Sequence, residues 1–272
     1  MSSRPIISIS HLAPVLASNY VLAALAQIWT RNGFDVRVGE AHDELAAICI
    51  LHHDRTKLVN VPQAPRGAAH LNCNVLDISK RAVSTLQLNR SDAWNGPVII
   101  KTNGNHFGIP DTWGLRRSLL TRARLRLRRL SWRAARMTPP GDYPILSGIE
   151  KVPNWVWDDP ELVVEKFLPE RTGEGLYALR GWMFLGDKSY GYRLLSSHPL
   201  VKVGSMLAHE PLSDVPEELT ALRAKLKFDF GKFDYVVHDG RAIVLDTNKT
   251  PTYSGEETPR LRSLAQGIEA FL

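Results

Sequence analysis

Several features that define whole classes of protein are absent from this chain of 272 residues. It holds only two cysteines, Cys49 and Cys73, with no metal-ligand spacing, which excludes a disulfide scaffold and a cysteine-based zinc site. No apolar run reaches the 18 residues of a transmembrane helix, and no internal repeat or low-complexity tract is visible. Because both cysteines lie in apolar surroundings, we expect reduced core residues in a cytoplasmic protein.

The N-terminal third predicts a small parallel α/β lobe. Its first apolar stretch faintly resembles a signal peptide, but His11, Pro14, Asn19 and Tyr20 interrupt it. Strand–helix–strand alternation fits better. It predicts strands over residues 5–9, 35–38 and 45–51, and a helix from about residue 13 to 31 that ends at Asn32-Gly33. With 44% apolar and 23% charged residues, the composition is that of an ordinary globular chain.

Residues 230–251 carry the clearest chemical signal. Two apolar runs, Phe233–Val237 and Ala242–Leu245, flank an Asp239-Gly240 turn signal and predict a β-hairpin. Its open end carries Asp234 on the first strand and, two apart on the second, the pair Asp246 and Asn248. Two carboxylates and an amide oxygen are ligands that suit a hard cation such as Mg²⁺. The alternative is a surface hairpin with solvated acids.

The turn decides whether these acids meet. A two-residue Asp-Gly loop would place Asp234 opposite Leu245, so that Asp234 and Asp246 face opposite sides. A three-residue loop over residues 238–240, with Gly240 in the left-handed conformation, would place both acids on one face. We therefore predict the three-residue loop.

Asp234, Asp246 and Asn248, followed by Pro251, resemble the metal-binding end of ATP-grasp enzymes such as D-alanine–D-alanine ligase and the peptide ligases. The resemblance implies that these three side chains hold Mg²⁺ against the phosphates of ATP. Lys232 stands where the family places a cation that contacts the transferring phosphoryl group. The family more often has Glu at the position of Asp246 and Arg at that of Lys232, so these two matches are by charge.

Three further segments match the family in order. Residues 96–101 resemble the strand whose lysine, here Lys101, reaches the ATP phosphates. Residues 162–170 resemble the strand that cradles adenine; Glu170 or Glu174 would bind the ribose. Residues 177–184 resemble the following strand, whose arginine, Arg180 here, reaches toward phosphate. The residues that this resemblance assigns to ATP are Lys101, Glu165, Lys166, Phe167, Leu168, Glu170 and Arg180.

The resemblance implies an α/β chain with α+β lobes. The expected lobes are an N-terminal parallel α/β lobe (1–75), a small lid lobe (76–164) and a C-terminal antiparallel-sheet lobe with the metal site (165–272). One departure is the loop over residues 102–108, which holds only two glycines where the family has a glycine-rich loop. His106 in that loop is a candidate phosphate or substrate contact.

The implied activity is that of an ATP- and Mg²⁺-dependent carboxylate–amine ligase, which forms a C–N bond through an acyl phosphate. Lys232 would stabilise the transferring group, and Arg193 would clamp the carboxylate of a small-molecule or peptide substrate. Residues 253–255 lie where the family places substrate-binding loops. Two alternatives remain, an ATP-grasp kinase and a non-catalytic nucleic-acid-binding protein.

The nucleic-acid alternative rests on residues 115–137, which contain nine arginines and no acid. Apolar residues at spacings of three and four predict one amphipathic helix with a buried stripe: Leu115, Leu119, Ala123, Leu127, Leu130, Ala134 and Met137. The arginine face would bind an anionic partner, line the entrance for an anionic substrate, or pack against acids of another lobe or a second subunit in a homodimer. Arg116 and Arg117 are the members expected nearest to substrate.

Overall fold

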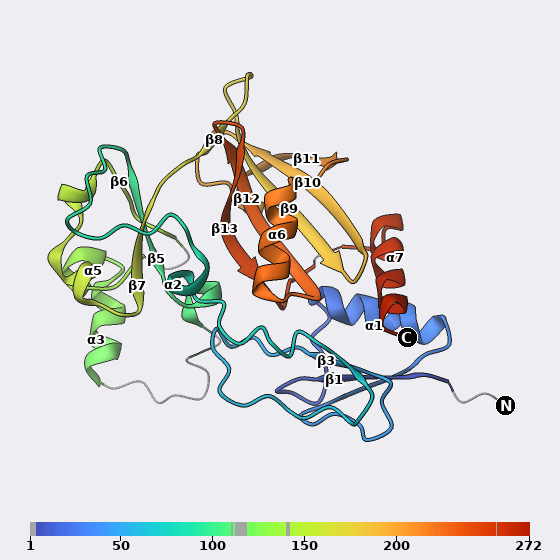
Figure 1. Cartoon of the computed structure of the whole chain (residues 1–272). Helices are drawn as coiled ribbons and strands as arrows, with labels where there is room; N and C mark the ends of the chain where they lie inside the picture. Colours follow the sequence, from blue (N-terminus) through green and yellow to red (C-terminus); the bar gives the residue numbers. More distant parts are fainter. Residues whose placement is uncertain (1–3, 110, 112–118, 140–141, 254) are drawn as a thin grey trace. The chain divides into compact units, whose positions relative to one another are not determined.

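The computed structural model describes residues 4–109, 111, 119–139, 142–253 and 255–272 (Figure 1). The chain divides into two compact units. The larger unit comprises Met1–Asp54, Leu58–Leu76 and Glu170–Leu272, and the smaller unit comprises Arg55–Lys57 and Asp77–Pro169.

A four-stranded parallel sheet opens the larger unit, with the strand order β2-β1-β3-β4. Its strands are β1 (Ile6–Ser10), β2 (Asp35–Gly39), β3 (Ile48–Leu51) and β4 (Ala69–Leu71). Every residue of β3 is buried, as expected for an apolar run at the centre of a parallel sheet. The predicted parallel α/β lobe is confirmed in its strands.

An antiparallel sheet of six strands fills the C-terminal part of the larger unit. Five strands follow the order β11-β10-β9-β12-β13, and β8 pairs with β9. These strands are β8 (Glu170–Arg171), β9 (Tyr177–Leu185), β10 (Lys188–Ser196), β11 (Met206–Leu212), β12 (Phe230–His238) and β13 (Arg241–Asn248). The helical elements of this unit are α1 (Val21–Arg31), α6 (Glu217–Leu226), α7 (Pro259–Ala265) and the 3-10 helices η4 (Val203–Ser205) and η5 (Gln266–Phe271).

Helix α1 begins at Val21, so the predicted start near residue 13 is wrong. The chain before it is irregular, and Tyr20 forms an antiparallel bridge with Thr252. Pro14 disfavours a helical conformation in the residue that precedes it. The bridge to residue 252 then fixes Tyr20 before the helix, which starts at Val21, eight residues later than predicted.

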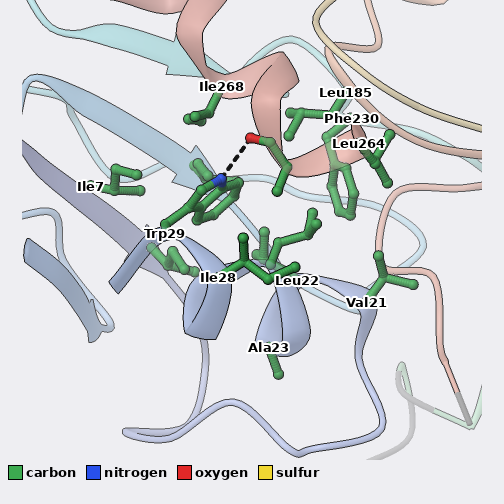
Figure 2. Packing of buried hydrophobic residues seen from close by; sticks show 14 of the residues in the cluster. Ile7, Val21, Leu22, Ala23, Ile28, Trp29, Leu185, Phe230, Leu264 and Ile268 are labelled. Atoms are coloured by element: carbon green, nitrogen blue, oxygen red, sulfur yellow. Dashed lines mark hydrogen bonds between the residues drawn. The ribbon is translucent and has the colours of Figure 1, made fainter. Parts of the chain in front are cut away.

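One hydrophobic core joins the two sheets of the larger unit (Figure 2). Trp29 of α1 is 1% exposed and donates its indole N–H to the carbonyl of Ala265 in α7, at 2.8 Å. Leu185 and Phe230 of the antiparallel sheet belong to the same cluster. Each large side chain that is fully buried in this way contributes about 1.5–3 kcal/mol. The three-lobe division stays a prediction, and the structure shows that its first and last segments share one core.

The smaller unit is built on a three-stranded antiparallel sheet of order β6-β5-β7. Its strands are β5 (Val98–Thr102), β6 (Ile145–Leu146) and β7 (Leu162–Lys166). Its helical elements are α2 (Lys80–Val83), α3 (Leu119–Leu127), α4 (Trp132–Ala135), α5 (Asn154–Asp158), η1 (Asn105–Gly108) and η3 (Ile149–Lys151). Val98, Ile100, Val156 and Val164 form its core.

The arginine-rich segment is not one helix, so that prediction is wrong for the described residues 119–137. Helix α3 ends at Leu127, and α4 starts after Ser131, whose side chain caps the N–H of Ala134. Arginines recur four apart along the segment with no acid between them, and such like-charge pairs destabilise a long helix. Arg124 bends back instead and donates to the carbonyls of Ala135 and Arg136, at 2.8 and 2.6 Å.

The predicted apolar stripe of this segment is also exposed rather than buried. Leu119 is 83% exposed, Leu130 is 86% exposed, and Ala135, which lies outside the predicted stripe, is buried. The break between α3 and α4 shifts the helical phase, and this removes the continuous buried face. Leu115, Arg116 and Arg117 lie outside the described residues.

Two further expectations concern the cysteines and the membrane. Both cysteines are free thiols, but only Cys49 is a core residue, while Cys73 is half-buried. Burial raises the pKa of the Cys49 thiol to about 11. Among the helices of the described residues, none has the length and apolar character needed to cross a membrane.

Candidate active site

The β12–β13 hairpin closes with a two-residue loop, so the predicted three-residue loop is wrong. His238 pairs with Arg241, and Asp239 and Gly240 form the turn with φ values of +51° and +75°. Both central residues of a type I′ turn need positive φ, and this turn matches the twist of the flanking strands. Asp-Gly supplies such a pair at low cost, since Asp tolerates the left-handed region.

A β-bulge brings the two acids together nevertheless. The register is Tyr235 with Val244 and then Asp234 with Asp246, so Leu245 is the extra residue of the second strand. The bulge offsets the shorter loop by one residue. Asp234 and Asp246 therefore lie directly opposite each other on one face, as predicted, but for a different physical reason.

Four polar side chains share this face of the sheet. Lys232 is paired with Asn248 in the same register that pairs Asp234 with Asp246. The Lys232 ammonium lies 2.9 Å from a carboxylate oxygen of Asp234. Burial opposes the charge of Lys232, but Asp234 and the neighbouring Asp246 outweigh it and raise the pKa of the lysine above its ordinary value. The lysine is therefore a permanent cation beside two acids.

Tyr192 of β10 packs over Gly181 of β9 on this same face. A Cβ atom at Gly181 would lie 2.2 Å from the Tyr192 ring, so the position requires glycine. Burial raises the pKa of Tyr192, while the charge of Lys232 acts in the opposite direction. Tyr192 could not be found from the sequence, because only the pairing of β9 with β10 places it beside this group.

The donor set fits a hard cation. Asp234 and Asp246 offer carboxylate oxygens from adjacent strands, and Asn248 offers an amide oxygen two residues along from Asp246. The Asn248 oxygen already accepts the N–H of Thr250 at 2.8 Å, which fixes its orientation. Within the described ranges, no group of three or more His, Cys, Asp or Glu side chains is arranged to hold a metal ion. A metal at this hairpin would therefore complete its shell with water or phosphate oxygens.

Arg180 and Arg193 lie on the opposite face of the sheet. Arg180 pairs across the strands with Tyr235, whereas Asp234 pairs with Gly181, so the alternation of the strands separates Arg180 from the acids. Arg193 pairs with Arg180 and shares its face. The structure does not bring either arginine together with the four polar side chains.

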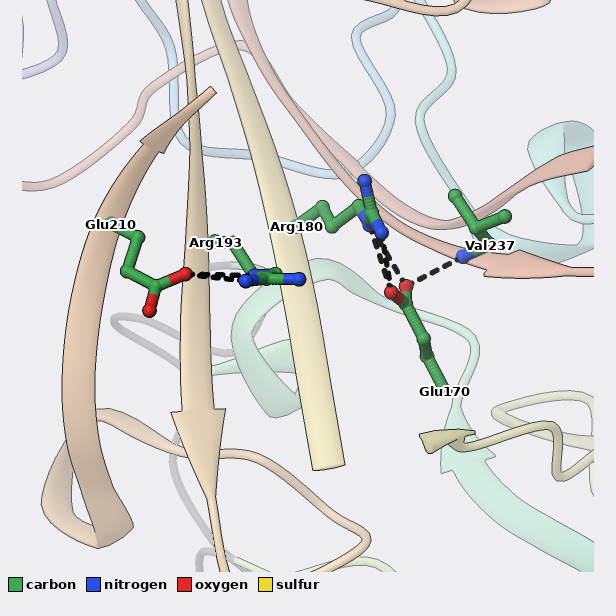
Figure 3. A network of polar contacts seen from close by, with 5 residues as sticks. All are labelled: Glu170, Arg180, Arg193, Glu210 and Val237. Carbon is green, nitrogen blue, oxygen red and sulfur yellow. Dashed lines mark hydrogen bonds and ion pairs between the residues drawn. The ribbon is translucent and has the colours of Figure 1, made fainter. Parts of the chain in front are cut away.

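Each of these arginines is held by a glutamate (Figure 3). Arg180 makes a bidentate contact with Glu170, with a shortest distance of 2.6 Å, and the same carboxylate accepts the N–H of Val237 at 2.7 Å. The hydrogen bonds that Arg180 donates to the Glu170 carboxylate raise the pKa of Arg180. Arg193 meets Glu210 at 2.6 Å. Glu170, predicted for the ribose, thus has both oxygens engaged within the protein.

The other predicted nucleotide residues lie in the smaller unit. The Lys101 ammonium on β5 is 2.7 Å from the Glu165 carboxylate on β7, and both side chains are buried. The Lys166 ammonium lies 4.9 Å from the centroid of the Trp94 ring, a cation–π contact. Phe167, half-buried like Leu168, donates its N–H to the carbonyl of Pro97 at 2.9 Å.

The loop after β5 forms the 3-10 helix η1. Phe107 and Gly108 both have positive φ, and the N–H of Asn105 donates to the Thr56 hydroxyl at 2.8 Å. The placement of the His106 side chain and of Ser254 lies outside the described residues. Their roles as substrate contacts stay predictions.

Comparison with known proteins identifies the fold. No protein-family profile and no curated protein sequence matches the chain. The solved structure of the ATP-grasp ligase PsnB with minimal precursor, Mg and ADP is 12% identical, with a TM-score of 0.55 over 100% of this chain and 99% of that chain. The chain has an ATP-grasp fold.

Two more solved structures are similar to this chain. PsnB complexed with minimal precursor is 10% identical, with a TM-score of 0.53 over 98% of this chain and 99% of that one. D-alanine–D-alanine ligase from Bacillus anthracis complexed with ATP is 13% identical, covering 99% of this chain and 97% of that one with a TM-score of 0.48. The two PsnB structures confirm the predicted ATP-grasp fold with its mixed α/β architecture.

Proposed function

We propose that this chain is an ATP- and Mg²⁺-dependent ligase that joins a carboxylate to an amine through an acyl phosphate. The observation that carries the proposal is the meeting of Lys232, Asp234, Asp246 and Asn248 on one face of the C-terminal sheet of an ATP-grasp fold. PsnB, which has this fold, was solved with Mg, ADP and a minimal precursor. That structure supports a nucleotide and Mg²⁺ as ligands here.

Asp234, Asp246 and Asn248 would hold Mg²⁺, which when bound neutralises charge on the phosphates. Phosphoryl transfer needs fixed positions and charge neutralisation more than covalent help from the protein. The set of two carboxylates suits this role because the bulge at Leu245 fixes their spacing.

Lys232 is the proposed electrostatic catalyst. It is a half-buried cation held 2.9 Å from Asp234, so it is oriented before any substrate binds. A preorganised cation stabilises charge that develops on the transferring phosphoryl group and on the acyl phosphate. When the neutral amine nitrogen attacks the acyl carbon, the C–N bond forms, the bond from that carbon to the phosphate oxygen breaks, inorganic phosphate leaves, and the nitrogen releases one proton to water.

By resemblance, Lys101 and residues Glu165–Leu168 are proposed to bind ATP. The contact of Lys101 with Glu165 gives the lysine a fixed place on the sheet of the smaller unit. Arg180 and Arg193 are left out of the proposed chemistry, because the register puts them on the other face of the C-terminal sheet with glutamate partners. The substrate class is a small-molecule or peptide carboxylate together with an amine.

Isotope exchange within ATP tests the proposal. ATP labelled with ¹⁸O in the β,γ bridge is incubated with the protein, Mg²⁺ and a panel of amino acids, dicarboxylic acids and acidic peptides. Reversible transfer to a carboxylate frees the β-phosphate to rotate, so the label moves to a non-bridging position without any amine. Hydroxylamine added to the active mixture should trap the acyl phosphate as a hydroxamate.

Hydroxylamine trapping and calorimetry separate the alternatives. A stable phosphorylated product that hydroxylamine does not convert would indicate a kinase. Calorimetry that detects no binding of ATP with Mg²⁺ to the folded chain would exclude both the ligase and the kinase. In that case the exposed arginines of α3 and α4 would be tested for binding to nucleic acid.

A further inference from the structure

A cluster of titratable side chains lies at the carboxyl end of the parallel sheet, apart from the four polar residues of the hairpin. This histidine cluster consists of His11, directly after β1, His52, His53 and Asp54, directly after β3, and Tyr20. All five are at least nine-tenths buried, and His52 is fully buried. Titratable groups are seldom concentrated in a core unless they have a function there.

The topology makes this a place for a ligand. Strand β1 lies at the centre, with β2 on one side and β3 on the other, so the connection from β2 to β3 crosses over β1. The strand order therefore reverses between β1 and β3. In open α/β sheets, ligands bind outside the carboxyl ends of the strands at such a switch point.

The contacts of His52 settle its tautomer. The Nδ1 atom of His11 lies 2.8 Å from the carbonyl oxygen of His52, so this nitrogen must carry a proton and donate. The Nδ1 atom of His52 lies 3.4 Å from the same nitrogen and faces its proton as an acceptor. Burial and the neighbouring His11 and His53 lower the pKa of His52 well below its usual value, so the ring is neutral. Its one proton then lies on Nε2.

That proton has no acceptor among the described residues. The Nε2 atom of His52 is buried without a hydrogen-bond partner, and so is the Oδ1 atom of Asp54. The other carboxylate oxygen of Asp54 accepts the Tyr20 hydroxyl, and the Tyr20 ring packs edge-on against His52, with centroids 4.8 Å apart. Tyr20 thus holds His52 and Asp54 in place. The Nε2–H group of His52 remains as a donor, and the Oδ1 atom of Asp54 remains as an acceptor. Leaving such groups unpaired in a core costs about 1–3 kcal/mol each, and a bound ligand removes that cost.

The cluster also adjoins the strand that carries the proposed metal ligands. After Asn248 the chain continues through the buried Lys249 to Pro251, whose carbonyl accepts the N–H of Val21 at 2.9 Å. Thr252 then bridges to Tyr20. Lys249 is near enough to His52 to act on its pKa. Within the larger unit, a few residues thus connect Asp246 and Asn248 with the cluster.

The chemistry of the two unpaired atoms defines the ligand. A carboxylate oxygen binds a protonated amine, and a neutral histidine N–H binds a carbonyl or carboxylate oxygen. Metal binding does not fit, because the Nε2 atom of His52 carries the proton of the neutral ring and has no lone pair to offer a metal. We propose that the histidine cluster binds the amine co-substrate of the ligase, with the amino group on Asp54 and a carboxylate or carbonyl oxygen of the same molecule on His52.

This inference rests on the proposed function and names its second substrate as a primary amine that also carries an oxygen acceptor, as amino acids and their amides do. Asp54 and His52 bind the molecule, and Tyr20 is a positioning residue that acts through Asp54. The short link from the hairpin to the cluster places such an amine close to the strand that ends in Asp246 and Asn248.

A titration followed on the histidines tests the site without knowledge of the carboxylate. The full chain is labelled with ¹⁵N in histidine only and titrated with each of the twenty common amino acids and their amides, with ethylamine and acetate as half-molecules. At least one amino acid or amide should shift the His52 Nε2 resonance saturably, at concentrations well below those needed for either half-molecule. Asp54→Asn should raise the Kd about 10- to 100-fold, the loss expected for a hydrogen bond to a charged group.

The matched control is Asp35→Asn. Asp35 lies at the amino end of β2, and the cluster lies at the carboxyl ends of β1 and β3 in the same parallel sheet, so the Kd should not change. Tyr20→Phe should weaken binding less than Asp54→Asn while the thermal transition shows a folded protein. The proposal is overturned if no amino acid or amide shifts His52, or if Asp54→Asn binds as tightly as wild type, since the unpaired atoms would then hold water only. A saturable shift with no isotope exchange in ATP would instead refute the ligase and leave the amine site standing.

Discussion

The two faces of the C-terminal sheet are built from the same strands but differ in how their charged side chains are arranged. One face carries Lys232 together with Asp234, Asp246 and Asn248, and the Lys232 ammonium lies 2.9 Å from Asp234. On the other face Arg180 and Arg193 each meet a glutamate, so the charges pair off one to one. The first face thus combines two carboxylates with an amide oxygen, which are ligands that suit a hard cation. We therefore propose that the first face carries the chemistry and that the ion pairs of the second face stabilise the sheet.

The strongest test of this contrast is Asp246→Asn, which keeps the shape of the side chain and removes its charge. We expect turnover to fall about 10²–10³-fold, the usual loss when one preorganised electrostatic group is removed from an active site. Steady-state ADP release measures it. Asp239→Asn is the matched control in the turn of the same hairpin. Its side chain is exposed and asparagine tolerates its positive φ, so activity should stay within twofold. Equal losses in both variants would contradict the assignment.

Glu170→Ala tests the other face through stability. Removing this buried carboxylate leaves Arg180 and the N–H of Val237 without their acceptor, so we expect a loss of about 2–4 kcal/mol in the free energy of unfolding. Urea denaturation measures it. If Glu170 has only this structural role, the KM for ATP of the folded variant should not change. A large rise in that KM would restore the ribose-binding role that the sequence suggested.

Gly181→Ala tests the packing that keeps the first face in order. The added methyl group must displace the Tyr192 ring, and overpacking of this kind typically costs about 1–3 kcal/mol. Thermal or urea unfolding measures the loss. The double variant with Tyr192→Ala should recover part of it, because the methyl group then has room. If the losses in unfolding free energy of the two single variants simply add in the double variant, Gly181 and Tyr192 do not pack against each other.

These residues also show what the sequence can predict. Asp234, Asp246 and Asn248 could be found from their spacing and their resemblance to a family, because each is a local pattern. The turn was predicted wrongly. The bulge at Leu245 depends on the pairing register of β12 with β13, and residues 238–240 carry no signal for it. Strand periodicity gives the face of Arg180 relative to its neighbours in β9, but only the pairing of β9 with β12 relates it to Asp234. The break in the arginine-rich segment likewise could not be predicted from apolar spacing. It results from repulsion between arginines and from the cap at Ser131.

Arg193 gives the smallest expected effect and the clearest conflict between sequence and structure. The sequence predicts that it clamps the acceptor carboxylate, whereas the structure pairs it with Glu210 on the face away from Lys232. Both partners are about one-third exposed or more, and an ion pair of that kind contributes at most about 1 kcal/mol. We therefore expect Arg193→Gln to change the unfolding free energy by less than about 1 kcal/mol and kcat/KM for the carboxylate by less than threefold. A carboxylate clamp would instead raise the KM for that substrate tenfold or more, since a bidentate charged contact is lost. If the KM rises tenfold or more, Arg193 must leave Glu210 when substrate binds. The proposal that the second face only stabilises the sheet would then be wrong.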